Sequence, residues 1–175
     1  DATLIAAARP SCARDEVAWR RPNKRFVAQG IYLPSVSAET RMGRVVIGID
    51  TSGSIEDSAL SVFVKEVNDI AETGRPECVT MIYCDTRVQR VDHYAAEDFP
   101  LKARPEGGGG TDLREVFDHV EREGLAPDCL LLFTDCRTPW PEHAAWPTLA
   151  CSTTALTAPS NIADTIHFPE EVQSP

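Results

Sequence analysis

Three runs rich in apolar and β-branched residues constrain the fold of this chain more than any other feature. They span residues 44–50 (RVVIGID), 78–84 (CVTMIYC) and 129–134 (CLLLFT). Near-continuous apolar runs of this length are typical of strands that are buried on both faces. A sheet covered on both sides is therefore predicted.

Two amphipathic helices are predicted between these strands. The first carries its apolar residues on one face of a 3.6-residue period and ends at Gly74, while the second follows residues 107–110. Their apolar positions are Leu60, Phe63, Val64, Val67, Ile70 and Ala71 in the first, and Leu113, Val116, Phe117 and Val120 in the second. Alternating strands and helices predict an α/β fold, an open doubly wound (Rossmann-like) and mostly parallel sheet with helices on both faces.

Weaker patterns complete this prediction. A short strand at 87–91 follows residues 78–84 so closely that an antiparallel edge hairpin is expected. Two further strands are expected near 149–154 and 163–168, and a short helix near 95–99. Asp112, with Glu115 three residues later, fits an N-terminal capping pair for the second helix.

The length of 175 residues fits one domain. Residues 1–43 contain prolines and no sustained period, and we interpret them as an extended arm or the tail of an upstream domain. The main domain is expected over 44–168, with a C-terminal tail over 169–175. A basic cluster at residues 20–25 is interpreted as a solvated patch, with a phosphate or partner site as the alternative.

The charge and the cysteines narrow the classes of function. A net charge of −10 argues against binding to nucleic acid or to anionic membranes, and no run of about 20 apolar residues predicts a membrane span. Six cysteines without Cys-x-x-Cys spacing favour free thiols in a reducing cytoplasm. Cys84 and Cys136 are interpreted as structural thiols, with a redox-sensitive role as the alternative. Trp140 and Trp146 are expected either to rim the binding face or to pack beneath it.

Three polar clusters follow predicted strands or lead into the second helix. They are residues 50–54 (DTSGS), 110–112 (GTD) and 134–135 (TD). Ligands of open α/β sheets bind in the crevice outside the carboxyl ends of the strands, at the point where the strand order reverses. If the strands 44–50 and 129–134 are neighbours, Asp50 and Asp135 share that crevice.

These clusters supply an all-oxygen set of donors. Carboxylates come from Asp50 and Asp135, and hydroxyl groups come from Ser52, Ser54 and Thr111. Hard oxygen ligands suit Mg²⁺, Mn²⁺ or Ca²⁺ better than Zn²⁺ or Cu²⁺. A divalent ion would also offset the repulsion between two close carboxylates. Water and one open position for a carboxylate from outside would complete the coordination.

Asp50-x-Ser52-x-Ser54, followed in order by Thr111 and Asp135, resembles the metal-ion-dependent adhesion site of von Willebrand factor A domains. The resemblance covers roughly residues 44–168. It implies that these five residues hold the metal. It also implies a protein-binding function, in which a Glu or Asp of the partner takes the open coordination position.

A second resemblance concerns the arm, through residues 19–26 (WRRPNKRF) and 32–34 (YLP). These residues resemble a bacterial group in which a von Willebrand A-like domain ends a predicted metallopeptidase-like protein. Such proteins are intracellular and often linked to an AAA+ ATPase of the MoxR type, which is therefore a candidate partner. No His-Glu-x-x-His motif occurs in these 175 residues, so peptidase activity is not assigned to them.

Two other functions remain as alternatives. A metal-dependent phosphotransferase or hydrolase would use the same oxygen set, but Ser52 stands where a second Asp would be needed, and no nucleophile–base pair is evident. Gly107–Gly110 lacks the Gly-Lys-Ser/Thr of a nucleotide-binding loop. A scaffold domain that has lost its metal is the other alternative. We therefore expect a binding domain and not an enzyme.

Overall fold

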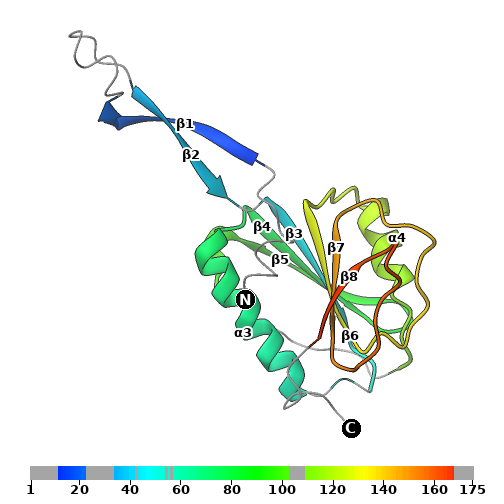
Figure 1. Cartoon of the computed structure of the whole chain (residues 1–175). Helices are drawn as coiled ribbons and strands as arrows, with labels where there is room; N and C mark the ends of the chain where they lie inside the picture. Colours follow the sequence, from blue (N-terminus) through cyan, green and yellow to red (C-terminus); the bar gives the residue numbers. More distant parts are fainter. Residues whose placement is uncertain are drawn as a thin grey trace.

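The computed structural model describes residues 12–22, 34–41, 43–53, 55, 57–102 and 109–167, the first two ranges by their backbone alone. Strands β1 (Cys12–Pro22) and β2 (Pro34–Arg41) form an antiparallel pair separate from the main sheet (Figure 1). The sequence pattern did not predict these strands. Pro22 ends β1 and Pro34 begins β2, and the two prolines are register partners. The end of a strand tolerates a missing backbone N–H. The predicted tail at 169–175 lies outside the described residues.

The main sheet has six strands in the order β5-β4-β3-β6-β7-β8. All neighbouring strands are parallel except β4 and β5, which are antiparallel at one edge. The predicted α/β fold with one antiparallel edge strand is confirmed. The strands are β3 (Arg44–Asp50), β4 (Cys78–Cys84), β5 (Val88–Ala95), β6 (Cys129–Thr134), β7 (Thr148–Ser152) and β8 (Asp164–His167). Within the described ranges, the helices are α3 (Asp57–Gly74), the short 3₁₀ helix η1 (Ala96–Asp98) and α4 (Arg114–Arg122).

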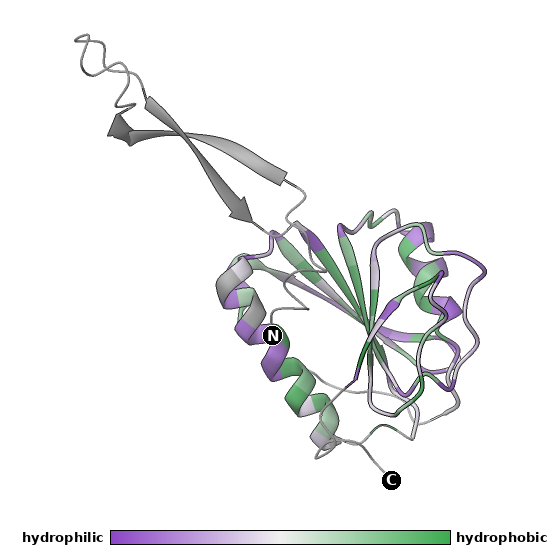
Figure 2. Cartoon of the chain, viewed as in Figure 1, coloured by the Kyte–Doolittle hydropathy of each residue, from purple (hydrophilic) through white to green (hydrophobic). Residues whose placement is uncertain are grey.

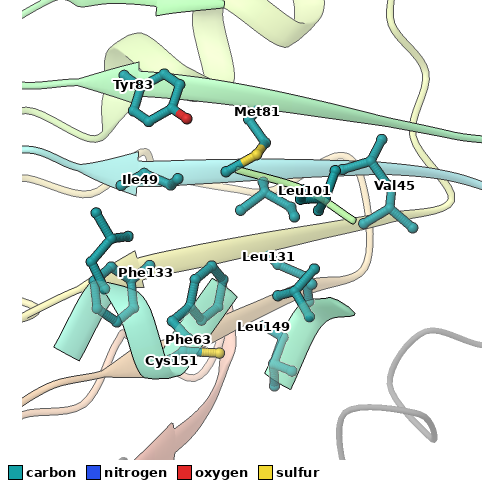
Figure 3. Close-up of a cluster of buried hydrophobic side chains, with 14 of the residues drawn as sticks. Val45, Ile49, Phe63, Met81, Tyr83, Leu101, Leu131, Phe133, Leu149 and Cys151 are labelled. Carbon is teal, nitrogen blue, oxygen red and sulfur yellow. The ribbon is translucent and has the colours of Figure 1, made fainter. Parts of the chain in front are cut away.

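Helix α3 covers one face of this sheet. Alternate residues of β3, among them Val45 and Ile49, pack in one cluster with Phe63 of the helix (Figure 3). The Phe63 ring stacks on Phe133 of β6, with ring centroids 4.7 Å apart. This face is the larger apolar core and joins β3, β4 and β6 to α3.

Helix α4 covers the opposite face, and the hydropathy colouring shows apolar residues along the strands between the two helices (Figure 2). Gly48 lets α4 approach closely, because a Cβ atom there would lie 2.8 Å from Leu132 and 2.9 Å from Val116. Trp140 and Trp146 are partly buried against this cluster, so they contribute to packing. The connections 135–147 and 153–163 contain no helix, and their apolar residues cover the rest of this face.

Two details differ from the sequence prediction. Strand β5 extends to Ala95, because it pairs with the whole of β4. At the start of α4 the cap residue is Leu113, which makes no side-chain cap bond, so the predicted capping pair of Asp112 and Glu115 does not form. The Asp112 carboxylate instead accepts the Arg114 backbone N–H at 3.1 Å and the Arg114 guanidinium at 2.9 and 2.6 Å. The Asp112 backbone N–H bonds to the Asp85 carbonyl oxygen. In the part of the chain that is described, no helix has the length and apolar character to cross a membrane.

Candidate functional site

The point where the strand order reverses lies at β3. From β3 the chain passes through α3 to β4 on one side, and it later returns through α4 to β6 on the other side. Asp50 pairs with Cys84 of β4, and Ile49 pairs with Phe133 of β6, so the three strands end at the same edge of the sheet. We call this the carboxyl edge. The expected adjacency of strands 44–50 and 129–134 is confirmed. In open α/β sheets, this is the place where ligands bind.

Asp50 lies at the centre of this edge and is only 1% exposed. Its Oδ1 atom accepts hydrogen bonds from the Ser52 backbone N–H and the Thr111 hydroxyl, each at 2.9 Å. Its Oδ2 atom accepts a hydrogen bond from the Thr134 hydroxyl at 2.9 Å. Segments that follow β3, precede α4 and end β6 therefore meet on one carboxylate.

The other predicted ligands are placed as follows. Ser52 is buried beside Asp50 in the same turn, and Asp135 is buried directly after β6. The Oδ1 atom of Asp135 accepts the Arg137 backbone N–H at 2.8 Å. Ser54 lies outside the described residues. The structure thus brings Thr111 into contact with Asp50, and it places Asp135 one residue beyond Thr134, which also contacts Asp50.

Thr134 is a site residue that the sequence pattern did not predict as a ligand, although it belongs to the polar cluster 134–135. It is fully buried, and its hydroxyl both donates to Asp50 and accepts the Cys136 backbone N–H at 3.1 Å. The alternation of side chains along β3 and β6 could have revealed it. Leu130 and Leu132 of β6 face α4, as does Val46 of β3, so Thr134 and Asp50 continue the same face at the two strand ends.

Residues at the end of β4 hold the site loops together. The Cys84 carbonyl oxygen accepts the Thr51 backbone N–H at 2.9 Å, and the Asp85 carbonyl oxygen accepts the Asp112 backbone N–H at 2.8 Å. The Cys84 thiol also donates to the carbonyl oxygens of Asp85 and Asp112, at 3.4 and 3.5 Å. Asp85 was absent from the predicted site, because no local pattern marks a residue that acts through its backbone on a distant loop.

Asp85 also organises its own turn. Its Oδ1 atom accepts hydrogen bonds from the Gln89 side chain at 2.8 Å, the Arg87 backbone N–H at 3.1 Å and the Thr86 hydroxyl at 3.3 Å. These bonds, with that of Gln89 the largest cause, lower the pKa of Asp85 below its ordinary value. Asp85 is therefore a carboxylate at neutral pH.

The cysteines that are free are Cys78, Cys84, Cys129, Cys136 and Cys151, which confirms the predicted free thiols at these five positions. Burial, reinforced by the Asp85 carboxylate, raises the pKa of Cys84 to about 12. Burial also raises the pKa of Cys136. Since the thiolate is the reactive form, both groups are suited to packing and hydrogen bonding. The structural interpretation of these two thiols is the one supported.

The donor set decides which kind of ion could bind here. Among the described residues, no three His, Cys, Asp or Glu side chains gather into a group that could hold a metal ion. The predicted set instead combines two carboxylates with hydroxyl groups, which fits a hard cation that keeps some of its water. The Thr111 hydroxyl and the Asp50 carboxylate already lie 2.9 Å apart. Two donors of the predicted set are therefore together, so the residues present are compatible with such a cation.

Comparison with known proteins identifies the family. A family model described as a VWA-like domain (DUF2201) matches residues 45–167. The chain belongs to this family. Membership confirms the von Willebrand A-like part of the sequence resemblance, and it supports a general role in protein interaction or scaffolding.

A relative from Thermotoga maritima is described only as an uncharacterized protein. It is 31% identical over 124 residues, which cover 69% of this chain and 28% of that protein. The matched region is therefore less than a third of the length of the relative.

Proposed function

We propose that this VWA-like domain binds a protein partner through a divalent cation. Asp50, Ser52, Ser54, Thr111 and Asp135 would hold Mg²⁺, or Mn²⁺ or Ca²⁺ in its place. A Glu or Asp side chain of the partner would take an open coordination position. The observation that carries this proposal is the contact between buried Asp50 and the Thr111 hydroxyl, 61 residues away in the chain.

The physical argument begins with the cost of burying a charge. A carboxylate removed from water is unfavourable unless an opposite charge or several hydrogen bonds compensate for it. The described partners of Asp50 are a backbone N–H and two hydroxyl groups, all of them neutral. A divalent cation at the carboxyl edge would compensate for the charge, and it would find oxygen donors already gathered there.

The same cation explains how an acidic domain could recruit an acidic partner. The chain has a net charge of −10, so long-range electrostatics oppose the approach of a carboxylate. The attraction must then come from a local positive charge at the point of contact. The bound cation supplies that charge, and it makes the interaction sensitive to chelators.

The cellular setting is also part of the proposal. The arm resembles that of bacterial metallopeptidase-like proteins, which favours a cytoplasmic system in which a MoxR-type AAA+ ATPase is a candidate partner. The role assigned to this chain is binding and not catalysis. Recovery of such an ATPase from a bacterial lysate on the immobilised full chain, lost on addition of a chelator and with Asp135→Ala, would support this setting.

A metal-free scaffold is the second candidate, and one observation favours it. Both oxygens of Asp50 already accept hydrogen bonds, so the carboxylate is partly compensated without any ion. In that case the network would serve only to join the loops, and partner binding would not respond to chelators.

Calorimetric titration of metal-free protein with Mn²⁺ and with Mg²⁺ separates the two candidates. We expect saturable binding that weakens at least about tenfold in Thr111→Val, equivalent to about 1.4 kcal/mol. Thr148→Val is the matched control, because the Thr148 hydroxyl bonds only locally, to the Trp146 carbonyl oxygen. No saturable heat with the wild-type protein would overturn the metal-dependent function and leave the scaffold.

A further inference from the structure

The loops of the carboxyl edge share a short sequence pattern, Asp-x-Arg. It occurs three times in the chain, at residues 85–87, 112–114 and 135–137. Residues 85–87 follow β4, residues 112–114 begin α4 and residues 135–137 follow β6. Every copy of the pattern in the sequence therefore lies at the edge that carries the candidate site.

The three copies have the same local geometry. In each, the Oδ1 atom of the Asp accepts the backbone N–H of the Arg two residues later, at 3.1 Å for Asp85, 3.1 Å for Asp112 and 2.8 Å for Asp135. Asp50 forms the same turn with Ser52 in place of an arginine. The central turn thus supplies candidate ligands, and the surrounding turns each present an arginine.

Two of these arginines are available to a partner. All three are exposed, but the Arg114 guanidinium is held by the Asp112 carboxylate at 2.9 and 2.6 Å. Among the described residues, the side chains of Arg87 and Arg137 make no hydrogen bond or ion pair. They follow β4 and β6, the two neighbours of β3, so they flank Asp50 on its two sides.

We propose that this edge recognises an extended acidic protein segment with carboxylates at three alternate positions. The central carboxylate would reach the cation, and the outer two would pair with Arg87 and Arg137. The inference rests on the proposed function for the central position. It extends that function by adding two residues that select several acidic groups over one.

The spacing of the strands agrees with such a segment. Neighbouring strands lie about 4.8 Å apart, so the ends of β4 and β6 are separated by about 10 Å. Alternate residues of an extended chain point to one side and are about 7 Å apart. The span of an outer pair of carboxylates, about 14 Å, is then within the reach of two long arginine side chains. The guanidinium fork also matches a carboxylate in two parallel hydrogen bonds.

The test uses two labelled synthetic peptides and fluorescence anisotropy in the presence of Mn²⁺. The three-Glu peptide alternates Ser with three Glu residues. The one-Glu peptide is the same except for Gln at the two outer Glu positions. The full chain is compared with Arg87→Gln, Arg137→Gln and the double variant. Lys65→Gln is the control, because it removes the same charge from an exposed position on α3. Circular dichroism checks that each variant is folded.

We expect the wild-type protein to bind the three-Glu peptide about tenfold more tightly than the one-Glu peptide. Each arginine variant should weaken binding of the three-Glu peptide about threefold, as expected for exposed ion pairs, and the double variant about tenfold. Binding of the one-Glu peptide should change less than twofold. Lys65→Gln should change neither.

Three results would overturn the inference. They are equal losses for both peptides in the arginine variants, a loss of the same size in Lys65→Gln, and no measurable binding of the three-Glu peptide at millimolar concentration. Failure of the proposed function has a different signature. Binding of the one-Glu peptide would then be the same with and without chelator. The inference about Arg87 and Arg137 would still be decided by whether these arginines give a preference for the three-Glu peptide.

Discussion

The polar groups at the two ends of strand β3 lie in opposite environments. At the amino end, Arg44 is exposed, and its backbone N–H and carbonyl oxygen bond to the carboxylate and backbone N–H of Asp128, at 2.8 and 2.9 Å. At the carboxyl end, Asp50 is buried, and its side chain collects hydrogen bonds from three segments of the chain. The same strand therefore has one solvated end and one end with a buried charge.

The two ends differ in what their carboxylates contribute, one to the stability of the fold and the other to the candidate site. An exposed carboxylate that bonds to a strand terminus adds to stability at little cost, since water solvates its charge. A buried carboxylate is costly unless hydrogen bonds or an opposite charge compensate for it. The carboxyl end of β3 is thus organised around one buried carboxylate and the donors that surround it.

Removing the carboxylate at each end of β3 should have the largest effect. Asp50→Ala should weaken Mn²⁺ binding by about a hundredfold, or about 2.7 kcal/mol, because the central donor is lost. Asp128→Ala should leave that affinity within about twofold and lower the free energy of unfolding by about 1 kcal/mol. Titration calorimetry and urea unfolding measure the two quantities. Equal effects of the two substitutions on metal affinity would contradict the assignment of the site to one end.

A substitution in the middle of β3 should lower the free energy of unfolding more than a substitution at either end. In Gly48→Ala the new methyl group would meet the side chains of Leu132 and Val116 below 3.0 Å, so these side chains must move, at a cost of about 2 kcal/mol. Gly110→Ala is the control, since its Cβ would lie 3.6 Å from Thr86, and we expect a change within about 0.5 kcal/mol. Urea unfolding midpoints compare the two. A stable Gly48→Ala protein would mean that α4 packs less closely than described.

Two substitutions of Thr134 test whether its hydroxyl group, which donates to Asp50, positions that carboxylate. Thr134→Val removes the hydroxyl that bonds to Oδ2 but keeps the shape of the side chain, and should lower the free energy of unfolding by about 1.5 kcal/mol. Thr134→Val should also weaken Mn²⁺ binding, because Asp50 loses a group that positions it. Thr134→Ser keeps the hydroxyl and should retain most of the wild-type affinity for Mn²⁺. Stability and Mn²⁺ titration of both variants check this prediction. If Ser and Val behave alike in metal binding, the hydroxyl does not position Asp50.

The smallest expected effect is a dependence on pH at the neighbouring strand. The pKa of Asp85 is lowered in the folded protein, chiefly by the Gln89 side chain. Its contribution to stability is therefore present above the unfolded pKa of about 3.9 and is lost as the pH falls through the lower, folded value. Asp85→Asn should lose less stability than the wild type between pH 5 and pH 3. Glu72→Gln, on the exposed side of α3, should follow the wild type.

Much of the fold could be predicted because its signals are local. An apolar pattern reflects which faces of an element are buried. The positions of β3 and α3 therefore agree with the run from Arg44 to Asp50 and with the helical period from Leu60 to Ala71. The hairpin of β1 and β2 escaped prediction, because no sustained period marks those residues. The length of β5 depends on its pairing with β4, which no local pattern encodes.

Residue order alone indicates which chemical groups stand at the strand ends. A carboxylate after β3, a hydroxyl before α4 and a carboxylate after β6 follow from residue order, since parallel strands of one sheet end at the same edge. Which of these groups touch depends on the folded arrangement of the strands. Strand order and register bring Thr111 and Thr134 to Asp50, tie Asp85 to the Asp112 loop and place Arg87 and Arg137 on either side. Such contacts join residues far apart in the chain, so they depend on how the strands are assembled.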